Sequence, residues 1–115
     1  MDEQCIFCRI INKKVPSDIV YEDDHVVVFK DINPQTPIHL LIVPKAHIPS
    51  LNDVSAEHTV ALGHVPIVAK KLAAEMGLGE RGWRLVINCG EEACQSVFHL
   101  HVHLLGGRTM SGQMA

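Results

Sequence analysis

The chain has 115 residues, 47% of them hydrophobic and 20% charged, which is typical of one globular domain over residues 1–115 and excludes a disordered chain. The formal net charge is -3 and the basic residues are scattered, so we expect no nucleic-acid partner. No apolar run approaches the roughly 20 residues that span a bilayer, and the acidic start does not resemble a signal peptide, so we expect a cytoplasmic protein without membrane contact.

The first half of the chain predicts one short helix and three strands. Residues 6–12 place their apolar side chains on one helical stripe. Strands are expected at 19–22, 26–29 and 38–43, because these runs are apolar and bounded by turn residues. The segment 31–37 is rich in turn residues and predicts a tight loop.

The second half predicts one long helix and two more strands. Ser55 is a candidate cap for the helix, and Pro66 is expected to kink it. The stripe expected to face the core is Val60, Ala61, His64, Val65, Val68, Leu72 and Met76. Strands are predicted at 83–88 and 98–105. Because consecutive strands are joined by short turns, the fold class is α+β with a five-stranded antiparallel sheet.

The last predicted strand carries the most informative pattern. Side chains of a strand alternate between its two faces. One face therefore carries His99, His101 and His103. The other face, expected to lie in the core, carries Phe98, Leu100, Val102 and Leu104.

Three interpretations of the histidine face are open. It could be a solvated polar face, although histidine is an unusual residue for that purpose. It could hold a zinc ion, since histidines two residues apart on a strand can bind one metal. It could also supply a nucleophile, because a neutral imidazole attacks well near pH 7 when its other nitrogen is tied to an acceptor.

The loop over residues 88–96 favours the nucleophile. It brings an amide, a hydroxyl and backbone N–H groups just ahead of the histidines, and such neutral donors suit the oxygens of a reacting phosphate. The sequence has no lysine-containing loop of the Walker type, so chemistry of the P-loop kind is not expected.

Cys5 and Cys8 form a C-x-x-C pair, the spacing of half a structural zinc site. In a cytoplasmic protein disulfides are rare, so the four cysteines are expected to be free thiols or metal ligands. The pair alone could also be redox-active, or two reduced thiols packed at the start of a helix.

The run Gln95-Ser96-Val97-Phe98-His99-Leu100-His101-Val102-His103-Leu104-Leu105 resembles the signature of the histidine triad (HIT) family. Residues 29–35 and 39–47 resemble the upstream blocks of that family. The resemblance covers roughly residues 5–108 and is closest to the small histidine-triad nucleotide-binding proteins, which are nucleoside phosphoramidases. It implies a five-stranded antiparallel sheet with two helices, paired into a homodimer.

The resemblance also implies catalytic roles. His101 would attack the α-phosphorus and carry the nucleotidyl group, and His103 would contact the phosphate. Ser96 would bond or protonate the leaving group, and His39 would support the site from a neighbouring strand.

A purine nucleotide of the AMP or GMP type is the ligand that the resemblance implies. Its phosphate oxygens would be held by Gln95 and Asn88, with Ser96, His101 and His103 alongside. The ribose hydroxyls would bind Asp31, since a carboxylate accepts from two donors, and Ile32 would pack on the base. Asp31 taken alone is equally a turn residue, and Asn88 taken alone could cap a strand.

The family completes the cysteine pair with two histidines. The implied ligands of a structural zinc are Cys5, Cys8, His47 and His99, and no organic cofactor is expected. The resulting hypothesis is a hydrolase of purine nucleoside 5′-phosphoramidates or related nucleotidyl esters. The alternatives are a nucleotide-binding regulatory module with little turnover, a dinucleoside polyphosphate hydrolase, and a metalloenzyme that uses the histidine face as its zinc site.

Two departures from the family stand out. Cys94 occupies a position where the family has glycine, which allows a positive φ and a close approach to phosphate. The tail from about residue 108 lacks the tryptophan found near the end of the nearest branch, and we expect it to be less ordered.

Overall fold

The computed structural model describes residues 3–115. The five strands in this part of the chain are β1 (Ile19–Glu22), β2 (Val26–Lys30), β3 (Ile38–Pro44), β4 (Trp83–Val86) and β5 (Val102–Gly106). They form one sheet in the order β1-β2-β3-β5-β4, and every neighbouring pair is antiparallel. The predicted α+β class and five-stranded antiparallel sheet are confirmed. Among the described residues, no helix combines the length and apolar character needed to cross a membrane.

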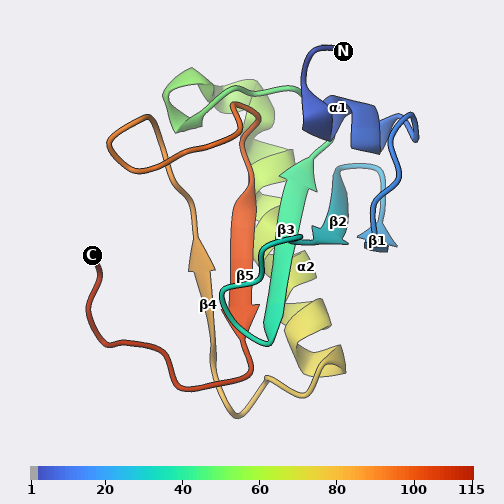
Figure 1. Cartoon of the computed structure of the whole chain (residues 1–115). Coiled ribbons are helices and arrows are strands. Elements are labelled where there is room, and N and C mark those ends of the chain that lie inside the picture. Colours follow the sequence, from blue (N-terminus) through green and yellow to red (C-terminus); the bar gives the residue numbers. More distant parts are fainter. Residues whose placement is uncertain (1–2) are drawn as a thin grey trace.

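The two helices pack on opposite faces of the sheet. Figure 1 shows α2 (Thr59–Glu75) running along one face and α1 (Ile6–Ile11) lying across the other, near one end of the sheet. The core under α2 contains, among others, Val65, Val68, Leu72, Leu40, Ile42, Leu100, Val102 and Leu104. The core under α1 contains, among others, Phe7, Ile10, Val27, Phe29 and Leu41. Because α1 covers only part of its face, the rest of that face is open to carry a site.

Helix α1 begins where the sequence indicated. The Sγ atom of Cys5 accepts a hydrogen bond from the backbone N–H of Cys8 at 3.4 Å, so a thiol takes the place of the usual oxygen cap. The helix ends at Ile11 and Asn12 caps it, followed by Lys13, whose φ is +61°.

Helix α2 starts later than Ser55, and its buried stripe is narrower than predicted. Ser55 precedes a single 3₁₀ turn, Ala56–His58, which leads into α2. The helix continues through Pro66, which lies on its exposed side. The prediction that Val60 faces the core was wrong, since 68% of it is exposed. The apolar period identifies the stripe of α2, but it does not show whether the sheet covers the first turn of the helix, where Val60 lies.

Strand β5 begins four residues later than the alternating pattern suggested. In the β3–β5 register Ile42 pairs with Val102, so the next bonded position along β3 would be Pro44, which has no N–H to donate. The carbonyl of Pro44 instead accepts from the ring Nε2 of His99 at 2.7 Å. Phe98 lies outside the ladder and is 53% exposed, so its predicted place in the core was wrong.

Strand β4 ends at Val86, so Asn88 lies in the following loop and not in the strand predicted over 83–88. Beyond Gly106 the chain has no helix or strand, although Arg84 donates to the Ser111 carbonyl at 2.8 Å. The order of the tail from residue 108 stays a prediction.

Candidate active site

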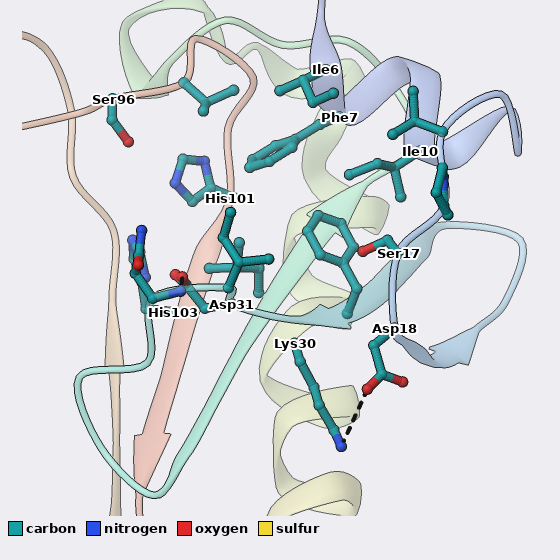
Figure 2. Close-up of a pocket in the computed structure, with 17 residues that line it drawn as sticks. Ile6, Phe7, Ile10, Ser17, Asp18, Lys30, Asp31, Ser96, His101 and His103 are labelled. Atoms are coloured by element: carbon teal, nitrogen blue, oxygen red, sulfur yellow. Dashed lines mark hydrogen bonds and ion pairs between the residues drawn. The ribbon is translucent and has the colours of Figure 1, made fainter.

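A cavity of about 670 Å³ lies between α1 and the open part of the sheet. Figure 2 shows Ile6, Phe7 and Ile10 of α1 forming one wall. Its opposite end is polar, and the polar side chains there are Asp31, Ser96, His101 and His103. A pocket that is mostly apolar with a few converging polar groups is the usual form of a small-molecule site.

His101 is buried beside this cavity and its ring orientation is fixed. The ring Nδ1 lies 2.8 Å from the carbonyl oxygen of His99. A carbonyl only accepts, so Nδ1 carries a proton, and in the singly protonated ring the lone pair is on Nε2. The edge contact with Phe7, at 5.0 Å between ring centroids, holds the imidazole in place. Both requirements for an imidazole nucleophile are therefore met.

His103 and His39 contact each other across β5 and β3. The His39 Nε2 and His103 Nδ1 atoms are 2.9 Å apart. Burial lowers the pKa of His39, although the nearby Asp31 carboxylate acts in the opposite direction. Burial, followed by the proximity of His101 and His39, lowers the pKa of His103 to about 4. Both rings are therefore neutral near pH 7.

Asp31 has both of the environments considered for it. Its Oδ1 accepts from the backbone N–H of Asn33 at 2.8 Å, which makes it a turn residue. Its Oδ2 lies 3.3 Å from the Nε2 of His39, and the residue also lines the cavity. Ile32, the next residue, also lines the cavity and is 92% exposed, so it presents an apolar surface that a ligand could cover.

The loop before the histidines is held closed by its own amides. The Gln95 side chain donates to the carbonyls of Pro49 at 2.7 Å and Val97 at 3.1 Å, and it accepts from the Gly90 N–H at 2.9 Å. Asn88 donates to the Ala93 carbonyl at 2.8 Å. These two amides fix the loop shape and do not line the cavity, whereas the exposed Ser96 does. Their contacts with phosphate oxygens stay predictions.

Cys94 adopts the left-handed conformation that glycine favours. Its φ is +63°, and its N–H donates to the Glu91 carbonyl at 2.9 Å to close the turn. A residue with a side chain costs roughly 1–2 kcal/mol in this conformation. Replacement by glycine removes that cost, but it also increases the conformational entropy of the unfolded chain, which offsets part of the stabilisation.

We expect Cys94→Gly to raise the free energy of unfolding by about 0.5–1 kcal/mol, which denaturant titration measures. Cys94→Ala is the matched control, since it removes the thiol and keeps Cβ. An equal gain in both variants would show that the thiol, and not the backbone conformation, limits stability.

A second cluster of side chains includes His99, the first of the three alternating histidines at residues 99, 101 and 103, which together are called the histidine row. The donor atoms of Cys5, Cys8, His47 and His99 all lie within 4.8 Å of one another. His99 Nδ1 is 3.4 Å from Cys5 Sγ, 3.5 Å from Cys8 Sγ and 3.2 Å from His47 Nδ1. His47 Nδ1 is 3.3 Å from Cys8 Sγ.

These spacings fit a tetrahedral zinc ion. Normal zinc bond lengths put sulfur and nitrogen ligands about 3.6 Å apart and two nitrogens about 3.3 Å apart. The His99 Nε2–H bonds to the Pro44 carbonyl, so the lone pair on Nδ1 points toward the other ligands, as metal-binding histidines require. Burial lowers the pKa of His99 to about 4, so its ring is neutral and able to bind a metal.

Two parts of the site escaped the sequence interpretation. The apolar residues of α1 were identified as a stripe, but nothing in the pattern said that part of the stripe would border a cavity instead of the core. The backbone N–H of Gln35, which donates to His39 Nδ1 at 3.0 Å, leaves no trace in a side-chain pattern.

Comparison with known proteins agrees with this geometry. The family model described as "Scavenger mRNA decapping enzyme C-term binding" matches residues 4–115. A purine nucleoside phosphoramidase of Escherichia coli (strain K12) is 50% identical over 115 residues, which cover 100% of this chain and 97% of the relative. A 14 kDa zinc-binding protein of Zea mays is 50% identical over 112 residues, 96% of this chain and 87% of the relative.

A solved structure, a HIT family hydrolase from Clostridium thermocellum, matches with a TM-score of 0.96 and 44% identity over 100% of both chains. The fold and its row of histidines thus define the class, which is that of the histidine triad proteins. The chain belongs to the HIT family and is one of its hydrolases.

Proposed function

We propose that this protein hydrolyses purine nucleoside 5′-phosphoramidates, or related nucleotidyl esters, through a covalent nucleotidyl intermediate on His101. The observation that carries the proposal is the bond between His101 Nδ1 and the His99 carbonyl, which leaves Nε2 as the nucleophilic atom of a ring lining the cavity. The E. coli relative named as a purine nucleoside phosphoramidase supports the substrate class.

The reaction proceeds in two displacements at the α-phosphorus. The His101 Nε2 forms a bond to phosphorus as the P–N bond to the amine breaks, and the leaving nitrogen takes the hydroxyl proton of Ser96. Water then attacks the phosphorus and the Nε2–P bond breaks. The oxygen and one proton of the water stay on the released nucleoside monophosphate, and the other proton returns to the Ser96 oxygen. In the intermediate the His101 ring is cationic, so its Nδ1–H bond to the His99 carbonyl becomes stronger and stabilises the positive charge.

The rest of the nucleotide lies along the cavity. The phosphate contacts His103 and the loop held by Gln95 and Asn88, and the ribose hydroxyls bind Asp31. The base packs against Ile32 and the α1 wall. A cavity of about 670 Å³ is within the size range of pockets that bind ligands of this kind.

The four-residue cluster is proposed to bind one structural zinc. Its spacings fit the ion, and the Zea mays relative is named for zinc binding. Four protein ligands leave no open position, so the ion would tie α1 to the segment before β5 and would not take part in the reaction. Free thiols in this cluster suit the cytoplasm, which we propose as the location.

A symmetric homodimer is proposed to form along β4. Within the described residues β4 has a strand neighbour on one side only, so its other edge offers free backbone groups to a second copy. Exposed apolar residues on α2 and after β4, namely Val60, Ile67 and Ile87, would be covered by that copy. We expect sedimentation equilibrium to give twice the chain mass, and a monomer at micromolar concentration would contradict this.

Intact-protein mass spectrometry during turnover of adenosine 5′-phosphoramidate tests the proposed function. The expected result is a transient adenylyl adduct together with AMP as product. Binding of the compound without adduct or product would favour the regulatory module instead. That alternative is supported by Cys94, which places a side chain in the left-handed position of the loop over residues 88–96, where the family has glycine.

A further inference from the structure

Asp31, His39 and His103 form a three-residue cluster at the polar end of the cavity. Their ligand atoms lie within 4.8 Å of one another, and two histidines with a carboxylate are a common set of metal ligands. The same atoms could equally be joined by hydrogen bonds. His39 Nε2 is 2.9 Å from His103 Nδ1 and 3.3 Å from Asp31 Oδ2, so this one nitrogen faces both neighbours.

The backbone N–H of Gln35 decides between the two arrangements. It donates to His39 Nδ1 at 3.0 Å, so Nδ1 must carry a lone pair. In a neutral ring the proton is then on Nε2, where it points at His103 and Asp31. A metal on Nε2 would need the lone pair there and would force an Nδ1–H against the Gln35 N–H. The cluster is therefore a hydrogen-bonded chain.

The proton on His39 in turn determines the state of His103. The His103 Nδ1 accepts from His39 Nε2–H, so its own proton must be on Nε2. We propose that the Gln35 backbone N–H, acting through His39, holds His103 as the Nε2–H tautomer, so that this ring offers a hydrogen-bond donor to the substrate phosphate. The contact with phosphate rests on the proposed function, whereas the tautomer does not. Gln35 and His39 are thus positioning residues.

Neighbouring rings of the histidine row then hold opposite tautomers. The centroids of His101 and His103 are 5.1 Å apart. His101 gives Nδ1–H to a carbonyl and keeps a lone pair on Nε2, while His103 accepts at Nδ1 and donates from Nε2. One ring can therefore attack a phosphorus while the other binds a phosphate oxygen. In each ring the hydrogen-bond partner of Nδ1 determines whether Nε2 carries a lone pair or a proton, and so whether the ring can attack or donate.

Long-range ¹H–¹⁵N spectra of the histidine rings, recorded on the free protein at pH 7, test this inference. We expect the Nδ1–H form for His101 and the Nε2–H form for His39 and His103, each with well-separated ¹⁵N shifts. An Nδ1–H form or a doubly protonated ring at His103 would overturn the proposal. Addition of Co²⁺ to protein whose cysteine cluster is loaded with zinc should leave the His39 and His103 signals unchanged, and paramagnetic broadening of both would favour the metal site.

A matched pair of variants tests the role of His39. His39→Gln keeps a donor near the Nε2 position, because the Asp31 carboxylate favours the amide nitrogen on that side, while His39→Leu removes it. We expect averaged ¹⁵N shifts for His103 in the leucine variant and native-like shifts in the glutamine variant. The kcat for the phosphoramidate should fall by about 10–100-fold in the leucine variant and recover in part in the glutamine variant. Identical His103 ¹⁵N shifts in the native chain and the leucine variant would refute the proposal that His39 sets the tautomer of His103. If the native chain does not hydrolyse the phosphoramidate, the proposed function is wrong. The ¹⁵N shifts of the free protein then still test the proposed tautomers, because they do not depend on turnover.

Discussion

Replacement of His101 by alanine is expected to lower kcat for adenosine 5′-phosphoramidate by at least about 10⁴-fold, because it removes the proposed nucleophile and with it the proposed covalent route. No neighbouring ring can replace it. His103 has its Nδ1 turned toward His39, and His99 uses both ring nitrogens, one toward Pro44 and one toward the cysteine cluster. Steady-state kinetics with release of AMP as the readout measure the loss.

The control for His101→Ala is His58→Ala, which removes a histidine that does not line the cavity and should leave kcat unchanged. Thermal melting of both variants establishes that the fold is retained, and the alanine variant should also show no adenylyl adduct. Turnover of the His101→Ala protein at a rate near that of the native chain would remove this residue from the mechanism.

Loss of the proposed zinc should be the largest change in stability. Cys5, Cys8 and His99 are buried, and their ligand atoms lie within 4.8 Å of one another. Without an ion only weak thiol–imidazole hydrogen bonds join these side chains, so α1 loses the stronger tie to the segment before β5 that metal bonds would supply. We expect Cys8→Ser to lower the free energy of unfolding by at least about 3 kcal/mol, less than the full binding energy of zinc to an unfolded peptide, because the rest of the core remains.

Elemental analysis and denaturant unfolding measure the two parts of this prediction. The native chain should contain one zinc per chain, and Cys8→Ser should contain none. Cys89→Ser removes a thiol outside the cluster and should keep both zinc and stability. A native chain that is purified without zinc and is as stable as the zinc-loaded form would contradict the structural role.

The overall architecture could be predicted because it depends on local patterns. Alternation placed His101 and His103 on one side of a strand, and the apolar period on residues 6–12 identified α1. The limits of β5 could not be predicted, because they depend on its partner: Pro44 cannot donate, and that residue is far away in the sequence. The exposure of Val60 likewise depends on which surface lies against α2, and composition does not record this.

The site could be predicted in its side chains and not in its backbone. The four residues expected to bind zinc do meet, since their positions are fixed by α1 and the ends of β3 and β5. The phosphate contacts of Gln95 and Asn88 stay predictions, and in the structure their amides donate to the backbone carbonyls of residues 49, 93 and 97. An amide side chain can bind a ligand or close a loop, and only the folded geometry distinguishes these uses. The contribution of Gln35 comes from a peptide N–H that every residue except proline has.

His99 joins the two sites through a single residue. Its ring belongs to the cysteine cluster, and its carbonyl oxygen accepts the Nδ1–H of His101. A shift of the His99 ring therefore turns the same peptide unit that orients the His101 imidazole, the proposed nucleophile. Metal content and chemical competence should accordingly rise and fall together. A preparation in which only part of the molecules hold zinc would behave as a mixture of active and inactive enzyme, with its maximal rate proportional to the occupied fraction and its apparent substrate affinity unchanged.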